Sequence, residues 1–130
     1  MKQIPCRLFL LLVVLLIPAL SHQPSLKPPF ELFPFQDKIF HMAEFGGLAF
    51  AMVLNREDLK KRMRVPAMLS FGFFWGALDE LHQSFVPGRD CSAGDFAADS
   101  IGLIIGVFLF LHLAERIELR RQAKSSDSIL

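Results

Sequence analysis

The sequence predicts an all-α integral membrane protein, a bundle of about four transmembrane helices in one domain. Its 130 residues are 52% hydrophobic and have a mean hydropathy of +0.40. The apolar residues gather in four long runs that lack the alternation of a half-buried strand. Charged residues gather between these runs. The formal net charge of +1 leaves no basic excess to neutralise phosphates, which argues against nucleic acid as a partner.

Length decides which runs can cross a bilayer, because its hydrocarbon core requires a helix of roughly 20 mostly apolar residues. The third and fourth runs meet this length when their acidic ends are included, the second is marginal and the first is short. A soluble four-helix bundle is the alternative, but segments such as LLLVVLL offer no polar face. The four predicted helices cover residues 8–20, 39–54, 65–86 and 95–113.

Glycines at helical spacing predict where helices approach their neighbours closely. Gly72 and Gly76 lie about one turn apart in the third run, and Gly102 and Gly106 do so in the fourth. Small residues at this spacing allow helix backbones to come together within a membrane. We therefore expect these four glycines to mark packing faces.

The first run has two interpretations. Residues 1–21 form either an uncleaved signal anchor, which we prefer, or a cleavable signal peptide with small residues at Ala19 and Ser21. The later helices keep the same orientation in both cases. Residues 22–113 then form the helical membrane domain, and residues 114–130 form a charged cytoplasmic tail that we expect to be frayed.

The basic residues predict the orientation, because Lys and Arg concentrate on the cytoplasmic side of membrane proteins. Eleven of the 14 fall before the first run, between the second and third, or after the fourth. These regions share one face of a four-span protein, so both termini are predicted to be cytoplasmic. With five acidic residues, this face carries a net charge of +6. The opposite face holds three basic and eight acidic residues, a net charge of −5.

Polar residues at the outer ends of the predicted helices indicate a functional site. Ionisable groups within membrane spans tend to face the bundle interior or a wet cavity. Three helices contribute such groups at the same end, so we predict one outward-facing polar pocket. Its candidate residues are Asp37, Lys38, His41, Glu44, Asp79, Glu80, Gln83, Arg89, Asp95 and Asp99.

Helical spacing supports this convergence, although each residue has an ordinary structural alternative. Lys38, His41 and Glu44 share one helix face, and Asp95 and Asp99 lie one turn apart. The alternatives are a snorkelling Lys38, a core-packed His41, a solvated Glu80, a helix-capping Asp95, and an Arg89 that pairs structurally with Asp79 or Asp95.

Three stretches resemble sequence elements of the VanZ-like family of small integral membrane proteins. Residues 37–45, DKIFHMAEF, resemble the element DK-x-x-H-x-x-E-[YF], and residues 79–89, DELHQSFVPGR, resemble DE-x-x-Q-x-F-x-P-G-R. Residues 95–106 resemble D-x3-[ND]-x2-G-x3-G. The elements occur in the family's order, and Asp99 stands where the family often has Asn.

The resemblance implies a multi-pass protein of the bacterial cytoplasmic (inner) membrane. The family takes its name from an accessory protein of low-level resistance to the glycopeptide teicoplanin. The resemblance therefore also implies a role in the cell envelope, with antibiotic tolerance as one expression of it.

Three functional hypotheses follow for the pocket. In the preferred one, it binds an envelope amphiphile: a membrane lipid, a lipid-linked cell-wall precursor or a glycopeptide. The first alternative is an acid–base or metal-dependent hydrolase or transferase, since imidazole and carboxylates suit both chemistries. The second is a small transporter coupled to protons or ions through Glu44. The sequence shows no His-x3-His pair or phosphate-cradling glycine loop, so it assigns no metal ligand and no cofactor, and it leaves the oligomeric state open.

Overall fold

Four α-helices dominate the computed structural model of the chain, which describes residues 3–23, 35–89 and 91–127. The described residues contain no strand, which confirms the all-α prediction. Four of the charged residues that contribute to the predicted charge asymmetry lie outside the described residues: Lys2, Lys27, Glu31 and Asp90. The helices are α1 (Gln3–Ser21), α2 (Gln36–Leu54), α3 (Arg64–Gln83) and α4 (Ala93–Asp127), with the short 3₁₀ helices η1 (Arg56–Asp58) and η2 (Lys61–Met63) between α2 and α3.

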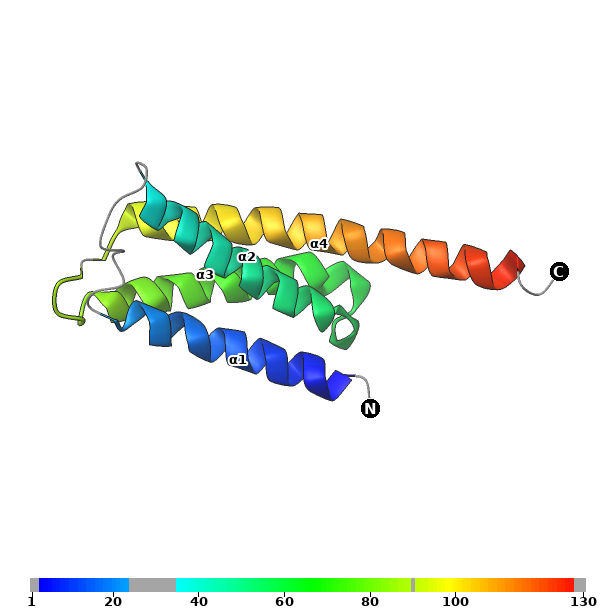
Figure 1. The fold of residues 1–130 in the computed structure, drawn as a ribbon, viewed down its shortest axis with the longest axis horizontal. Helices are drawn as coiled ribbons and strands as arrows, with labels where there is room; N and C mark the ends of the chain where they lie inside the picture. The colour runs from blue at the N-terminus through cyan, green and yellow to red at the C-terminus, as the bar shows by residue number, and fades with distance from the viewer. Residues whose placement is uncertain (1–2, 24–34, 90, 128–130) are drawn as a thin grey trace.

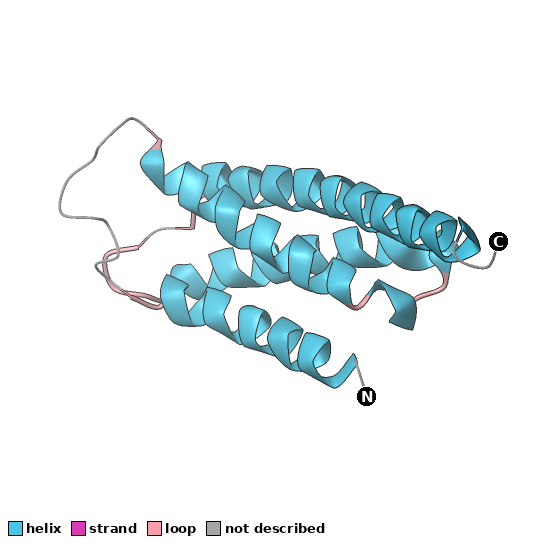
Figure 2. Ribbon diagram, turned by 45° about the vertical axis from the view of Figure 1, so that its right-hand side comes forward, coloured by secondary structure: helices cyan, strands magenta, loops and turns pink. Residues whose placement is uncertain are grey.

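The helices alternate in direction along one long axis (Figure 1). α1 and α3 therefore end where α2 and α4 begin, and we call this the polar end of the bundle. The opposite end, where α1 and α3 begin and α2 ends, is called the arginine end. α2 packs most extensively against α4, and α1 lies against α2 and α3. Figure 2 shows the same bundle from a second side, with α4 extending beyond the other helices.

The core of the bundle is thin. Phe45 and Leu48 of α2 are fully buried against Leu103 and Val107 of α4. Large apolar side chains cover the outer surface of all four helices, and Phe74, for example, is 61% exposed. Soluble monomers rarely expose contiguous apolar surface of this kind. Such a surface suits contact with lipid.

Among the described residues, two helices are long and apolar enough, by length and composition, to cross a membrane: α1, and α4 within Ala93–Ser126. α2 and α3 have 19 and 20 residues, similar to the 19 of α1. Ionisable groups near the ends of α2 and α3 lower the mean hydropathy of these two helices.

The expectation of a frayed tail after Leu113 is wrong. α4 continues without interruption to Asp127. The segment ERIELRRQAK is rich in strong helix formers, so the helix extends beyond its apolar part. An ion pair of 3.6 Å between Arg56 Nη2 and Glu118 Oε2 also ties this extension to the bundle.

The glycines of α4 lie where α2 approaches it. A Cβ at Gly102 would overlap the backbone of Met42, and one at Gly106 would lie 2.7 Å from the Cβ of Ala49. In α3, a Cβ at Gly72 would overlap the side chain of Leu103. Gly76 faces the ring of Phe45, 3.3 Å from the position of an added Cβ. The short backbone separation at Gly102 brings the first turns of α2 and α4 together at the polar end.

Candidate functional site

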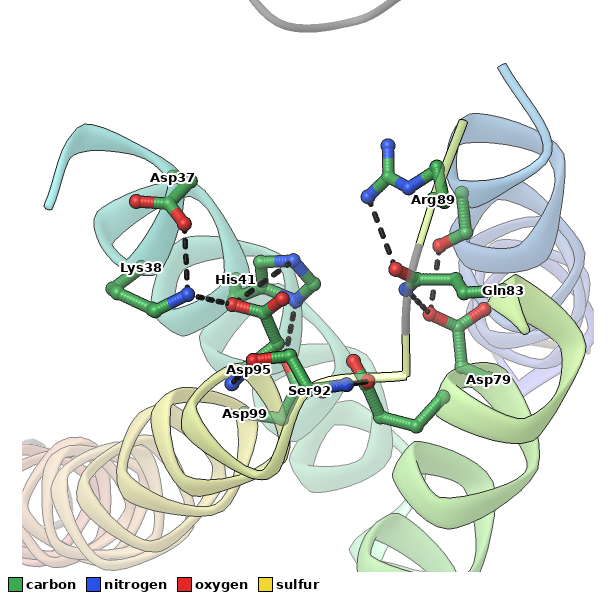
Figure 3. A network of polar contacts seen from close by, with 11 residues as sticks. Asp37, Lys38, His41, Asp79, Gln83, Arg89, Ser92, Asp95 and Asp99 are labelled. Carbon is green, nitrogen blue, oxygen red and sulfur yellow. Dashed lines mark hydrogen bonds and ion pairs between the residues drawn. The ribbon is translucent and has the colours of Figure 1, made fainter. Parts of the chain in front are cut away.

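One half of the polar end is built by the first turns of α2 and α4. His41 Nδ1 lies 3.0 Å from Asp99 Oδ1, and both side chains are buried. Its other ring nitrogen, Nε2, lies 3.9 Å from Asp95 Oδ1. Lys38 forms ion pairs with the same Asp95 oxygen and with Asp37, which is 2.7 Å away (Figure 3). These groups converge because positions 38 and 41 share a face of α2 and positions 95 and 99 share a face of α4.

The other half joins α1 to the end of α3. Asp79 Oδ2 accepts hydrogen bonds from Ser21 Oγ at 2.7 Å and from Gln83 Nε2 at 2.8 Å. Gln83 Oε1 accepts one from Arg89 Nη2 at 3.1 Å (Figure 3). The predicted structural pairing of Arg89 with Asp79 or Asp95 is not what the structure contains. Within the part of the chain that the structure describes, Arg89 is linked to Asp79 through the amide of Gln83.

Glu80 links the two halves. Its Oε2 accepts a hydrogen bond of 2.7 Å from the backbone N–H of Ser92, which immediately precedes α4. Ser92 Oγ in turn accepts from the backbone N–H of Asp95 at 3.2 Å, as the capping residue of a helix does. The cap of α4 is therefore Ser92, and the Asp95 carboxylate lies in the first turn, free to face Lys38 and His41.

The site buries more acidic groups than its cations neutralise. His41, Asp79, Glu80, Gln83 and Asp99 each expose 6% or less of their surface. The six carboxyl groups of the predicted pocket lie with only two permanent cations, Lys38 and Arg89. One oxygen each of Asp79, Glu80 and Asp99 is buried without a hydrogen-bond partner in the described part of the chain. Buried polar atoms nearly always have a partner, so each of these three oxygens requires a donor from a water molecule, an ion or a ligand.

A possible metal-ligand set lies between the halves. His41, Glu80 and Asp95 each offer one ligand atom, and the three atoms lie within 4.8 Å of one another. Imidazole and carboxylate are both common ligands of divalent metals. The arrangement is also compatible with acid–base chemistry, because Asp99 orients the imidazole of His41 much as an aspartate does in a catalytic dyad.

A sequence model of the VanZ/LLP1 family matches residues 7–115, which include every residue of the site. The chain belongs to the VanZ/LLP1 family. This confirms the resemblance seen in the three sequence elements. No curated protein and no solved structure matched the chain. Membership of the VanZ/LLP1 family, together with the apolar helices α1 and α4, indicates a membrane protein.

In this VanZ/LLP1 chain, the predicted pocket residues differ in how deeply they lie. Asp37 is exposed at the rim and contacts only Lys38 among the groups of the site. Glu44 is half-buried one turn below His41 and forms no hydrogen bond or ion pair with the described residues. The other eight predicted residues take part in the contacts described above.

Sequence reasoning missed two serines of the site. Ser21 closes α1 and donates to Asp79, but its small size suggested only a cleavage site. Ser92 was also absent from the predicted site, although Ser-x-x-Asp before an apolar run is a helix-start signal that could have identified it. His22, which was not among the predicted residues, has its Nδ1 3.2 Å from Nε2 of His82 at the exposed edge of α3.

Proposed function

We propose that the polar end binds the hydrogen-bond-donating headgroup of an amphiphile in the bacterial cell envelope. The observation that carries this proposal is the set of buried carboxylate oxygens on Asp79, Glu80 and Asp99 that lack a partner. A headgroup rich in hydroxyl or ammonium groups would supply the missing donors. A membrane lipid, a lipid-linked cell-wall precursor and a glycopeptide all carry such groups.

Apolar side chains beside the polar end support an amphiphile over a free polar solute. Phe40 in the first turn of α2 and Leu81 near the end of α3 are each more than half exposed, and Phe85, just beyond α3, is 77% exposed. An acyl or prenyl chain would cover such surface while its headgroup entered the polar cluster. Polar groups beside exposed apolar side chains offer separate contacts to the headgroup and to the hydrocarbon chain of one molecule.

The proposal is tested by the lipids that remain bound during purification. Wild type extracted in mild detergent is expected to retain one class of envelope amphiphile, identified by mass spectrometry of the organic extract. Asp79→Asn should retain several-fold less at equal protein recovery. Glu57→Gln, a charge loss at the arginine end, is the control and should retain as much as wild type. Equal retention by all three proteins would contradict the proposal.

We further propose that the chain is a multi-pass protein of the cytoplasmic membrane with its polar end facing outward. The basic residues at the arginine end support this orientation. Cys91 is exposed at the polar end and Cys6 lies near the start of α1, so the two native cysteines report on opposite ends. A membrane-impermeant maleimide added to intact cells should label Cys91 in the C6S variant and leave Cys6 unlabelled in C91S. The reverse pattern would overturn the orientation.

A hydrolase or transferase is the second candidate, and the His41–Asp99 contact specifically favours it. An imidazole whose Nδ1 is bonded to a buried carboxylate exposes its Nε2 as a base, and Nε2 here faces the centre of the site. Headgroup release from added envelope lipids by wild type, abolished in His41→Gln, would establish catalysis. Binding without release would leave the protein as a binding module.

A further inference from the structure

We infer that His41, Glu80 and Asp95 bind one divalent transition-metal cation between α2, α3 and α4. The three residues come from three different helices, so no short spacing motif in the sequence exposes them. In the folded chain their ligand atoms lie within 4.8 Å of one another, and His41 and Glu80 are buried. The inference goes beyond the proposed lipid binding and does not depend on it.

The distances are close to those of a metal site. Metal bonds of about 2.1 Å to nitrogen and oxygen hold neighbouring tetrahedral ligands roughly 3.4 Å apart. His41 Nε2 and Asp95 Oδ1 are already 3.9 Å apart. The widest separation in the set, at most 4.8 Å, would have to close by about 1.4 Å.

The surrounding contacts are those that support metal ligands. Metal-binding histidines almost always donate their other ring N–H to a carboxylate or carbonyl, which fixes the tautomer. Asp99 Oδ1, 3.0 Å from His41 Nδ1, provides such an acceptor and leaves the lone pair of Nε2 directed to Asp95. Glu80 is held by the Ser92 N–H through Oε2, so its Oε1 is the oxygen without a partner.

The local charge also favours a cation at this point. Glu80 and Asp99 are 97% and 99% buried, and Arg89 bonds to Gln83 rather than to either of them. Burying an ionised carboxylate without a compensating charge is strongly unfavourable. Lys38 compensates Asp95 from the rim, and a carboxylate has lone pairs enough for both an ammonium and a metal. A divalent cation would neutralise the two remaining negative charges, those of Glu80 and Asp99.

The donor set narrows the identity of the metal. One imidazole with two carboxylates suits Mn²⁺, Fe²⁺ or Zn²⁺ better than Cu⁺, which prefers thiolates, or Ca²⁺, which prefers all-oxygen sites. Three protein ligands leave at least one coordination position open for water or for an oxygen of a bound headgroup.

Mn²⁺ is the probe that tests the inference, because electron spin-echo spectroscopy detects nitrogen bonded to it. Protein without a polyhistidine tag, stripped with chelator and titrated with Mn²⁺, should bind one ion per chain and show ¹⁴N modulation. The modulation should vanish in His41→Gln and persist in His82→Gln. Zn²⁺ should displace the ion.

The matched pair of variants is Glu80→Gln and Glu57→Gln, which remove the same charge from the polar end and from the arginine end. Glu80→Gln should weaken Mn²⁺ binding at least tenfold, and Glu57→Gln less than twofold. Wild type that binds no Mn²⁺, or binds it without ¹⁴N modulation, would overturn the inference, as would equal weakening in the two variants. The wild-type spectrum decides the matter even if a variant fails to fold.

Discussion

The two ends of the bundle handle their charges in opposite ways. At the arginine end, Arg7 pairs with Asp58 at 2.8 Å, and Arg64 pairs with Glu57 at 3.1 Å. The four residues lie at the surface or close to it, and each carboxylate has an arginine partner. At the polar end, acidic groups are buried, outnumber the cations, and keep oxygens without partners.

This difference separates charges that serve the structure from charges that need another explanation. Exposed ion pairs contribute little to stability and are readily explained by solvation and membrane orientation. Buried and incompletely bonded carboxylates lower stability. Stability alone would not retain them, so the polar end is where selection for binding or chemistry is expected.

Replacing Gly102 should have the largest effect, because it removes the contact that assembles the polar end. A Cβ there overlaps the Met42 backbone, which cannot move as a flexible side chain does. Gly102→Ala is expected to lower the free energy of unfolding by about 3 kcal/mol. Gly47→Ala, with no atom within 4 Å of the added Cβ, should be neutral or stabilise by about 0.5–1 kcal/mol. Denaturant titrations of both variants in detergent measure the contrast, and similar losses would show that the helix contact is not the cause.

Ser21→Ala tests whether α1 belongs to the site. The variant loses the only described hydrogen bond between α1 and Asp79, a buried bond to a carboxylate. Such bonds contribute about 2 kcal/mol, and we expect a loss of that size in the free energy of unfolding. The same bond predicts that α1 is retained, so the intact mass of the purified protein should include residues 1–21. A mass that begins after Ser21 would show cleavage and remove α1 from the account.

Glu80→Gln should stabilise the protein when chelator is present. The amide oxygen can still accept from the Ser92 N–H, and the amide NH₂ replaces the oxygen that lacks a partner. Removing the buried charge is expected to add about 1 kcal/mol to the free energy of unfolding. Glu57→Gln at the arginine end should lower the free energy of unfolding slightly. If Glu80→Gln is less stable than wild type, the buried charge supports the structure and the proposed difference between the two ends is wrong.

Arg7→Gln should have the smallest effect, since its ion pair with Asp58 is exposed. The hydrogen-bonded guanidinium lowers the pKa of Asp58 from its ordinary value. The pair therefore stabilises the fold above that ordinary value, about 3.9, and this contribution is lost as the pH falls through the lowered pKa. NMR titration should find that the pKa of Asp58 rises toward its ordinary value in Arg7→Gln. An unchanged pKa would show that the pair does not form in solution.

Much of the fold could be predicted from the sequence, because apolar runs and the glycine spacing act locally along each helix. The continuation of α4 past Leu113 could not be predicted from apolar residues, since that part is helical through propensity and the Arg56–Glu118 contact. Helical periodicity correctly grouped Lys38 with His41 and Asp95 with Asp99. It could not show which residue of one helix faces which residue of another.

The pairings across helices were the unpredictable part of the site. Arg89 was expected beside a carboxylate, but the short loop carries it to Gln83 instead. Ser21 contacts Asp79 from 58 residues away, and no local pattern encodes such a contact. The grouping of His41, Glu80 and Asp95 likewise depends on how three helices pack.

The most direct test of the account is ligand-induced stabilisation by a total lipid extract of the bacterial envelope. A ligand that binds the folded state raises the unfolding temperature in proportion to its occupancy and affinity. The extract should raise the unfolding temperatures of wild type and of Glu57→Gln equally. It should raise the unfolding temperature of Asp79→Asn little or not at all. An equal rise in all three proteins would show that the lipids act on the apolar surface alone, and it would contradict the claim that the polar end is a binding site.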